Sequence, residues 1–456
     1  MKSRYLFLSL TLGLGLALAL LWLSAGGMAA RAAPAPAPAG AELHVCLSGC
    51  VYGTIQAAVH DALPGDVIKG TYSDVQHIPA LDTATFTATQ LVAITESLTI
   101  RGGYTAVDWT TSDPDAHPTV LDAGGAGRVM VIVGYVAPTI EGLRLTGGNS
   151  AGLGGSVYDY DAGGGLYILN STAVISHNQI YGNTGYRAGG VWLQDSAASL
   201  RANLVRDNTA GWAGAGLWLY RSPATVEAND IVSNTTLFGG GIVLHVSDAT
   251  LVGNNVLSNT ATSTEGGGIS VLSSGATLEG NLIRGNRVDQ SGGGVFLSLS
   301  DATLTNNVIA DNFSNARGSG VSVRGGAPRL IHNTIARNLG LGGGLYAVTS
   351  TVGIVSDVAL TNTIIYSHTE GIIAERNNTV TLHSTLWHNN LTDWIGQGTI
   401  THVADYQGDP AFATDGYHLT LASNAARDRG LPAGVATDVD GQPRPLGRGY
   451  DLGADE

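Results

Sequence analysis

Residues 239–259 read GGGIVLHVSDATLVGNNVLSN, and the chain writes close variants of this line seven times in succession. Each variant has a glycine cluster, an alternation of aliphatic residues, and two asparagines five positions apart. A repeat of this length with strand-type alternation and no helical period is typical of a β-solenoid. The last glycines of the clusters, spaced 24–27 residues apart, are Gly165, Gly190, Gly216, Gly241, Gly268, Gly294, Gly320 and Gly344.

Four rows of aliphatic residues recur at equivalent positions of the repeats and predict the core. The rows run from Leu166 to Leu345, from Ile168 to Ala347, from Ile175 to Leu330 and from Ile180 to Ile335. They indicate three short strands per repeat, stacked on the strands of the next repeat. The predicted fold is all-β, a right-handed parallel β-helix with three short strands per coil. About twelve coils between residues 96 and 400 would form a rod roughly 60 Å long.

Two rows of asparagine mark the turns of each coil. Asparagine tolerates left-handed backbone angles and bonds to its own turn. Stacked one coil apart, the amides can also bond to one another in ladders. We therefore expect two ladders. The first is Asn178, Asn203, Asn229, Asn254, Asn281, Asn307 and Asn333, and the second is Asn183, Asn208, Asn234, Asn259, Asn286, Asn312 and Asn338.

The segment before the repeats predicts a short amphipathic helix that caps the N-terminal end. Thr54 is its expected N-cap, and Pro64-Gly65 ends it. A solenoid needs such a plug, because its open end exposes core residues and unpaired strand edges. The apolar face of this helix is Ile55, Ala58, Val59, Ala62 and Leu63.

These features together resemble the secreted parallel β-helix repeat proteins with the pectate-lyase-type fold. Residues 52–66 are similar to the helix that caps the N-terminal end of such proteins. The tail DVDGQPRP at 438–445, followed by DLGADE at 451–456, resembles the terminal module called choice-of-anchor Q. The glycine and Asn-x-Ile rhythm is also similar to repeats of surface-displayed autotransporter passengers. The resemblance implies the fold and export, but no particular activity, because this fold hosts lyases, hydrolases and binders.

Residues 1–32 are expected to be a signal peptide. Lys2 and Arg4 precede an apolar run, and Ala30-Arg31-Ala32 offers a cleavage site. The alternative is a retained membrane anchor, because the apolar run is about long enough to span a bilayer. With the signal removed, we expect no membrane insertion, a secreted or extracellular-surface location and a monomer.

The remaining chain divides into four expected parts. Residues 33–42 form a Pro/Ala linker, and 43–95 form the N-terminal cap with its amphipathic helix. Residues 96–400 form the parallel β-helix, with regular repeats at 163–369. Residues 401–456 form a C-terminal capping module that closes the other end.

Charge and cysteine content restrict the partners and the compartment. The net charge is −14, and it becomes about −17 once Lys2, Arg4 and Arg31 are removed. This argues against nucleic acid and anionic membranes as partners. Cys46 and Cys50 are the only cysteines, and export of such a pair predicts a disulfide. No His or Asp set lies near them in sequence to complete a zinc site.

Aromatic residues occupy outward positions of the glycine strand in neighbouring early repeats. Outward rings suit stacking on sugars, because they offer flat apolar faces with polar edges. One alternative is an aromatic ladder that stiffens the sheet, and another is that loop aromatics cover the strand aromatics. The strand residues are Tyr167, Trp192, Trp218 and Tyr220, and the preceding loops add Tyr186, Trp212 and Phe238.

Candidate catalytic residues follow the same strand. Asp195, Arg221 and His245 end it in consecutive repeats, so their Cα atoms should lie about 5 Å apart. Hydrolysis on this fold would need a second carboxylate, and this row offers one acid. Asp159 and Asp161 are candidate calcium ligands, and no other cofactor is expected.

The leading hypothesis is a non-catalytic β-helix that binds a polysaccharide or another cell-surface component through the aromatic row. The alternatives are a polysaccharide lyase or glycoside hydrolase on the same face, and a purely structural rod. An uncovered aromatic groove without acids would favour the binder. Clustered acids around Asp195 would favour the enzyme, and burial beneath residues 149–163 and 183–189 would favour the rod.

Overall fold

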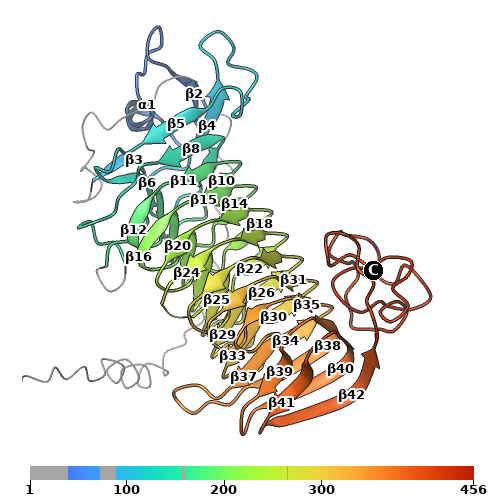
Figure 1. Cartoon of the computed structure of the whole chain (residues 1–456). Coiled ribbons are helices and arrows are strands. Elements are labelled where there is room, and N and C mark those ends of the chain that lie inside the picture. The colour runs from blue at the N-terminus through green and yellow to red at the C-terminus, as the bar shows by residue number, and fades with distance from the viewer. Residues whose placement is uncertain (1–39, 72–88, 157–159, 264) are drawn as a thin grey trace, which may run out of the picture.

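The computed structural model describes residues 40–71, 89–156, 160–263 and 265–456. It is a right-handed parallel β-helix, as predicted, and it has about 13 turns. Figure 1 shows the coils stacked into a rod, from α1 (Ile55–Asp61) at one end to β42 (Thr399–Gln407) at the other. The expected signal peptide 1–32 lies outside the described residues. Within the described ranges, no helix is both long and apolar enough to cross a membrane.

Each regular coil contributes one strand to a 12-stranded sheet that follows the glycine clusters, here called the glycine sheet. Its strands pair in parallel and in register, so Trp192 lies beside Trp218. The strands are β3 (Gln90–Ile94), β6 (Arg128–Val133), β9 (Leu166–Leu169), β13 (Val191–Gln194), β17 (Leu217–Tyr220), β21 (Ile242–His245), β25 (Ile269–Leu272), β29 (Val295–Ser298), β33 (Val321–Arg324), β37 (Leu345–Val348), β39 (Glu370–Ala374) and β41 (Thr392–Gly396).

The next two strands of each coil form two parallel rows of a 23-stranded sheet, here called the main sheet. The rows merge where β38 (Asp357–Tyr366), β40 (Thr379–His388) and β42 run through both positions. The first row is β1 (Glu42–Val45), β2 (Val67–Thr71), β4 (Thr99–Tyr104), β7 (Thr139–Glu141), β10 (Val174–Ser176), β14 (Ser199–Arg201), β18 (Thr225–Glu227), β22 (Thr250–Val252), β26 (Thr277–Glu279), β30 (Thr303–Thr305) and β34 (Arg329–Ile331). The second row is β5 (Thr119–Asp122), β8 (Leu143–Thr146), β11 (Gln179–Tyr181), β15 (Leu204–Arg206), β19 (Asp230–Val232), β23 (Asn255–Leu257), β27 (Leu282–Arg284), β31 (Val308–Ala310) and β35 (Thr334–Ala336).

Short strands in the loops before the glycine clusters make a third, 7-stranded sheet, here called the loop sheet. These loops lead the chain back from the main sheet to the glycine sheet of the next coil. The strands are β12 (Thr184–Arg187), β16 (Thr209–Ala213), β20 (Thr235–Thr236), β24 (Thr260–Ala261), β28 (Arg287–Val288), β32 (Phe313–Ser314) and β36 (Leu339–Gly340).

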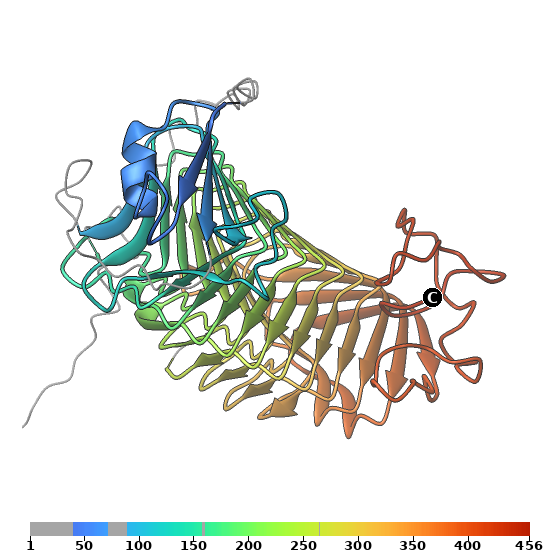
Figure 2. The ribbon, with the colours of Figure 1, turned by 90° about the horizontal axis from the view of Figure 1, so that it is seen from above.

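The four predicted aliphatic rows form one continuous core along the rod. Helix α1 covers its N-terminal end, with Ile55 and Ala58 buried and the Thr54 hydroxyl accepting a hydrogen bond from the Ala57 N–H at 3.1 Å. Figure 2 shows this helix against the first coils. Cys46 and Cys50, just before it, form the predicted disulfide.

Both asparagine ladders are present and buried. From Asn178 to Asn333, each Nδ2 donates to the Oδ1 of the asparagine one coil on, at 2.9–3.1 Å. From Asn183 to Asn338 the same bond measures 2.9–3.0 Å. The backbone N–H of each ladder asparagine donates to the same Oδ1 of the next asparagine, as from Asn254 to Asn281. Each Nδ2 also donates to a backbone carbonyl of the preceding coil, as from Asn254 to Val226 O at 2.8 Å. Each amide is thus fully hydrogen-bonded inside the rod.

One detail of the turns differs from expectation. The left-handed backbone angles fall on the residue before each ladder asparagine, such as His177 and Ala202, and not on the asparagine itself. The bend at the preceding residue leaves the asparagine free to aim its amide along the rod. Glycine serves the bend that starts most clusters, as at Gly239 with φ of 62°, and Ala188 takes this place in one of them with φ of 50°. A Cβ on Gly241 would lie 2.6 Å from the Gly268 carbonyl oxygen of the next coil.

A third ladder, made of serines, was not predicted. At the corner after the glycine sheet, backbone N–H groups donate to serine hydroxyls one coil on, at 2.8–3.4 Å. A repeated serine is a weaker sign of a buried ladder than a repeated asparagine, because serine is also common in exposed turns. The ladder residues are Ser171, Ser196, Ser222, Ser247, Ser274 and Ser300.

The second asparagine ladder ends on a histidine. Asn338 Nδ2 lies 3.2 Å from His368 Nε2, and His368 Nδ1 lies 3.3 Å from Asn390 Oδ1. Because an amide N–H donates and an amide oxygen accepts, a neutral imidazole with its proton on Nδ1 satisfies both neighbours. Burial lowers the pKa of His368 to about 3. The ladder therefore favours the uncharged form of this histidine.

The C-terminal module, residues 408–456, packs on the side of the rod, although we expected it to close the end. Figures 1 and 2 show it beside the last coils. Its backbone bonds to the outer face of the main sheet, through Asn306 Nδ2 to Thr437 O at 2.7 Å and Asn362 Nδ2 to Leu431 O at 2.7 Å. Outward residues of this face, such as Val308 and Ile364, pack against module residues such as Leu452 and Ala454. The late coils are therefore apolar outside as well as inside.

We predict that Asn254→Ala destabilises the rod by about 2–4 kcal/mol. The change leaves the buried Asn229 N–H without a partner, which costs about 1–3 kcal/mol, and it also removes the amide bonds to Val226 O and Asn281 Oδ1. The neighbouring Asn255, whose Nδ2 reaches the exposed Asp230 carboxylate, is the matched control. Thermal melting and hydrogen exchange should show a large effect for Asn254→Ala and under about 0.5 kcal/mol for Asn255→Ala. Equal effects would contradict the ladder's role.

We also predict that the rod loses stability as pH falls from about 6.5 towards 4. The pKa of His368 is about 3 when folded and about 6.5 when unfolded, so only the unfolded chain takes up a proton in this window. The loss from His368 should reach about 2 kcal/mol at pH 5. Melting temperatures between pH 7 and 4 should fall less steeply for His368→Gln than for the parent. An unchanged slope in His368→Gln would refute this assignment.

Candidate functional site

The aromatic residues of the glycine sheet point out of the main core, as predicted, but they are not accessible. The exposed fractions of Tyr167, Trp192 and Trp218 are 5 %, 0 % and 4 %, and Tyr220 is half-buried. The ring centroids of Trp192 and Trp218 lie 5.4 Å apart. The expectation of an open stacking face on these strands is therefore wrong, and their burial is the outcome that favours the structural reading of these strand residues.

The loops before the glycine clusters cover these rings. Ala162, Ala188 and Ala213 pack against them in a second hydrophobic cluster, separate from the main core. In the first covering loop, the Tyr167 hydroxyl donates to Gly155 O at 2.6 Å. Small residues let the loops approach the rings closely. The cover forms a second apolar layer outside the glycine sheet.

Three aromatic side chains on these covering loops remain exposed. Tyr160, Tyr186 and Trp212 have exposed fractions of 44 %, 39 % and 41 %, and we call them the loop aromatic strip. The rings of Tyr160 and Tyr186 lie 5.2 Å apart. Tyr186 and Trp212 stand on the paired strands β12 and β16. The guanidinium of Arg187 lies 4.7 Å from the centre of the Tyr160 ring and 5.0 Å from that of Trp218.

The three candidate catalytic residues do not form one site. Both oxygens of Asp195 accept hydrogen bonds from Arg221, each at 2.7 Å. His245 instead packs edge-on against Tyr220, with ring centroids 5.3 Å apart. Burial, followed by the nearby Arg187, lowers the pKa of His245 to about 4. Asp195 and Arg221 thus make a partly exposed bidentate ion pair, and His245 is a neutral packing residue at pH 7.

The candidate calcium ligands cannot be judged as a pair, because Asp159 lies outside the described residues. The carboxylate of Asp161 accepts the N–H groups of Gly152 and Gly154 at 2.9 and 2.8 Å. These bonds close the covering loop over Tyr167. A structural role for Asp161 therefore accounts for its position.

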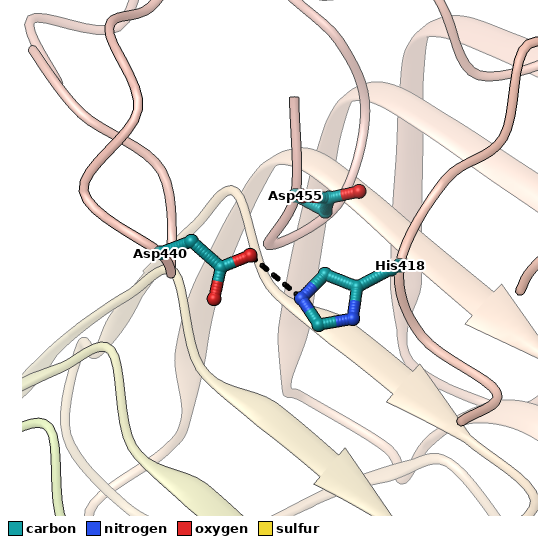
Figure 3. A group of neighbouring side chains, drawn as sticks. All are labelled: His418, Asp440 and Asp455. Atoms are coloured by element: carbon teal, nitrogen blue, oxygen red, sulfur yellow. Dashed lines mark hydrogen bonds and ion pairs between the residues drawn. The ribbon is translucent and has the colours of Figure 1, made fainter.

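A cluster that the sequence did not point to lies in the C-terminal module. His418, Asp440 and Asp455 come from three separate segments, and their ligand atoms lie within 4.8 Å of one another (Figure 3). His418 Nδ1 is 2.6 Å from Asp415 Oδ2, and His418 Nε2 is 2.7 Å from Asp440 Oδ2. The spacing of Asp415 and His418, three residues apart, was the one local signal. It could not reveal that the tail folds back to the same point.

A crystal structure of the pectate lyase Pel9A aligns with 91 % of this chain and 90 % of its own, at 13 % sequence identity and a TM-score of 0.36. A comparison with curated proteins found no significant match.

A family model described as "Periplasmic copper-binding protein (NosD)" matches residues 130–324 and again residues 239–357. The two matches overlap within the regular repeats. Together they span residues 130–357, which is half of the chain. The chain therefore belongs to the NosD family of β-helix repeat proteins.

Proposed function

We propose that this chain is an exported, non-catalytic β-helix protein that binds a polysaccharide or another surface glycan through the loop aromatic strip. The observation that supports this is the exposure of Tyr160, Tyr186 and Trp212, each about two-fifths accessible, on neighbouring loops. Grouped exposed aromatic rings are uncommon on soluble proteins unless they bind something. The proposed binding surface therefore lies on the covering loops and not on the strand aromatics beneath them.

The arrangement of the strip suits a chain of sugar rings. Tyr186 and Trp212 are carried by adjacent strands, so their backbones advance by about 4.8 Å, one strand spacing. Tyr and Trp offer a flat apolar face together with a polar edge. Arg187 places a positive charge beside Tyr160, although the chain as a whole is strongly acidic.

The absence of catalysis is part of the proposal. Both oxygens of Asp195 are engaged by Arg221, so this carboxylate is poorly placed to act as a base or nucleophile. The enzyme alternative, a polysaccharide lyase or glycoside hydrolase, would need further acids near this pair. Product analysis for new reducing ends or unsaturated sugars tests it directly.

The location and partners of the protein are inferred from the family description, the N-terminal composition and the net charge. The NosD family is described as periplasmic, and residues 1–32 have the composition of a signal peptide. We infer a periplasmic or extracellular monomer, with no nucleic-acid partner because of its negative charge.

Copper, which the family description names, does not fit the matched residues 130–357. Among described residues, the one group of three or more His, Cys, Asp or Glu side chains able to share a metal ion lies in the C-terminal module. Cu(I) also favours thiolate and thioether ligands. Cys46 and Cys50 are bridged, and Met130 is buried in the core. We therefore assign no copper centre to the repeats.

We predict that Trp212→Ala and Tyr186→Ala each weaken glycan binding about 5–30-fold. Losing one stacking ring removes about 1–2 kcal/mol of contact energy. A glycan array identifies the ligand, and calorimetry with that ligand measures the affinities of the variants. Tyr135, 79 % exposed and outside the strip, provides the control Tyr135→Ala, which should bind like the parent. Equal affinity in all variants, or no bound glycan, would favour the purely structural rod.

The buried strand aromatics should behave in the opposite way. We predict that Trp192→Ala destabilises the protein by about 3–5 kcal/mol, because it leaves a large cavity beneath the covering loops. Trp212→Ala should cost little, because its ring is 41 % exposed. Melting temperatures of the two variants distinguish the roles. A small loss for Trp192→Ala would show that the covering layer contributes little to stability.

A further inference from the structure

The His418 cluster, made of His418, Asp440 and Asp455, is a charged group that solvent can reach, and the C-terminal module does not depend on it for its stability. The module is already held by other contacts, above all the buried Arg444–Glu456 pair at 2.8 Å, with both side chains 0 % exposed. By contrast, the side chains of His418 and Asp440 are 27 % and 46 % exposed. The cluster therefore lies where an ion can reach it from solvent.

The imidazole of His418 is oriented by a second carboxylate. Asp415 Oδ2 lies 2.6 Å from Nδ1, and Asp415 Oδ1 accepts the backbone N–H groups of Tyr417 and His418 at 3.0 and 3.1 Å. A carboxylate on one ring nitrogen is the arrangement that fixes histidines bound to metals through the other. Nε2 is thereby directed at Asp440, 2.7 Å away.

The two acidic members are positioned independently of the histidine. Asp440 follows a turn in which Asp438 Oδ1 accepts the N–H groups of Asp440 and Gln442, at 3.0 and 2.7 Å. Asp455 is buried, and its Oδ2 accepts the N–H of Leu419 at 2.5 Å. Figure 3 shows the Asp440 carboxylate directed at His418, with Asp455 from the tail beside the ring. The donor atoms are therefore held in place without an ion.

A separate observation concerns Asp438, two residues before Asp440. Asp438 is 5 % exposed, and its Oδ2 has no hydrogen-bond partner among the described atoms. A buried carboxylate oxygen without a hydrogen-bond partner is costly, and an ion bound nearby is one explanation for such an atom.

We propose that His418, Asp440 and Asp455 bind a divalent transition-metal ion of the zinc class. One imidazole nitrogen and two carboxylate oxygens match the mixed donor sets of Zn²⁺, which accept water as a fourth ligand. Calcium prefers six to eight oxygen ligands, and this cluster offers fewer oxygens together with a nitrogen. Binding replaces the proton on His418 Nε2, so the affinity falls as pH decreases.

Isothermal titration calorimetry of the chelator-treated full-length protein with ZnCl₂ tests the proposal. We expect one Zn²⁺ per chain, a rise in melting temperature on binding, and affinity at least about tenfold lower in His418→Gln and Asp440→Asn. Both positions are partly exposed, so the variants should fold. CaCl₂ is titrated in parallel and should bind more weakly.

The matched control is His402→Gln. His402 also pairs with a carboxylate, Asp405, at 2.5 Å, but it belongs to no described three-residue group. It should bind Zn²⁺ like the parent. No binding, equal binding by the parent and His418→Gln, or tighter binding of Ca²⁺ than of Zn²⁺ would overturn the proposal. None of these outcomes depends on glycan binding, so the two proposals fail separately.

Discussion

The hydrogen bond from one asparagine amide to the asparagine one coil away is the constraint on which the rest of the structure depends. Each ladder amide donates along the rod and to a carbonyl of the preceding coil, while its oxygen receives a side-chain and a backbone N–H. A buried polar group so completely bonded stabilises only one alignment of neighbouring coils. A coil that slipped by one residue would lose these bonds in both ladders and reverse the inward faces of its strands.

This constraint is visible in the spacing of the sequence. From the last glycine of a cluster to the first ladder asparagine there are always 13 positions, and the second asparagine always follows five positions later. All variation in repeat length therefore falls between the second asparagine and the next glycine cluster. That segment forms the covering loops, which carry Tyr186 and Trp212. The scaffold is fixed, and the surface proposed to bind glycan is built on the part that can change.

The sequence was sufficient for the scaffold but only partly for the sites. Rows such as Ile175 to Leu330 predict inward positions because period-two alternation and coil spacing determine them together. The same alternation places Trp192 outward, but it cannot show whether a loop covers an outward ring, because the cover depends on small residues such as Ala188 and Ala213.

The position of the C-terminal module on the side of the rod does leave a trace in the sequence. Outward positions of the second main-sheet row change from Asp230 and Asn255 to Val308 and Ile364. The His418 cluster had almost none, because its members meet only through the path of the tail.

The constant spacing also determines how such a protein can be lengthened. Adding or removing a few residues within the 13-position segment would break the alignment, whereas copying an entire coil would leave every junction unchanged. Each copied coil extends the rod by about 4.8 Å and brings its own covering loop. The length of the rod and the number of displayed loops therefore increase together. A glycan-binding surface on those loops would gain one more binding loop with each copied coil.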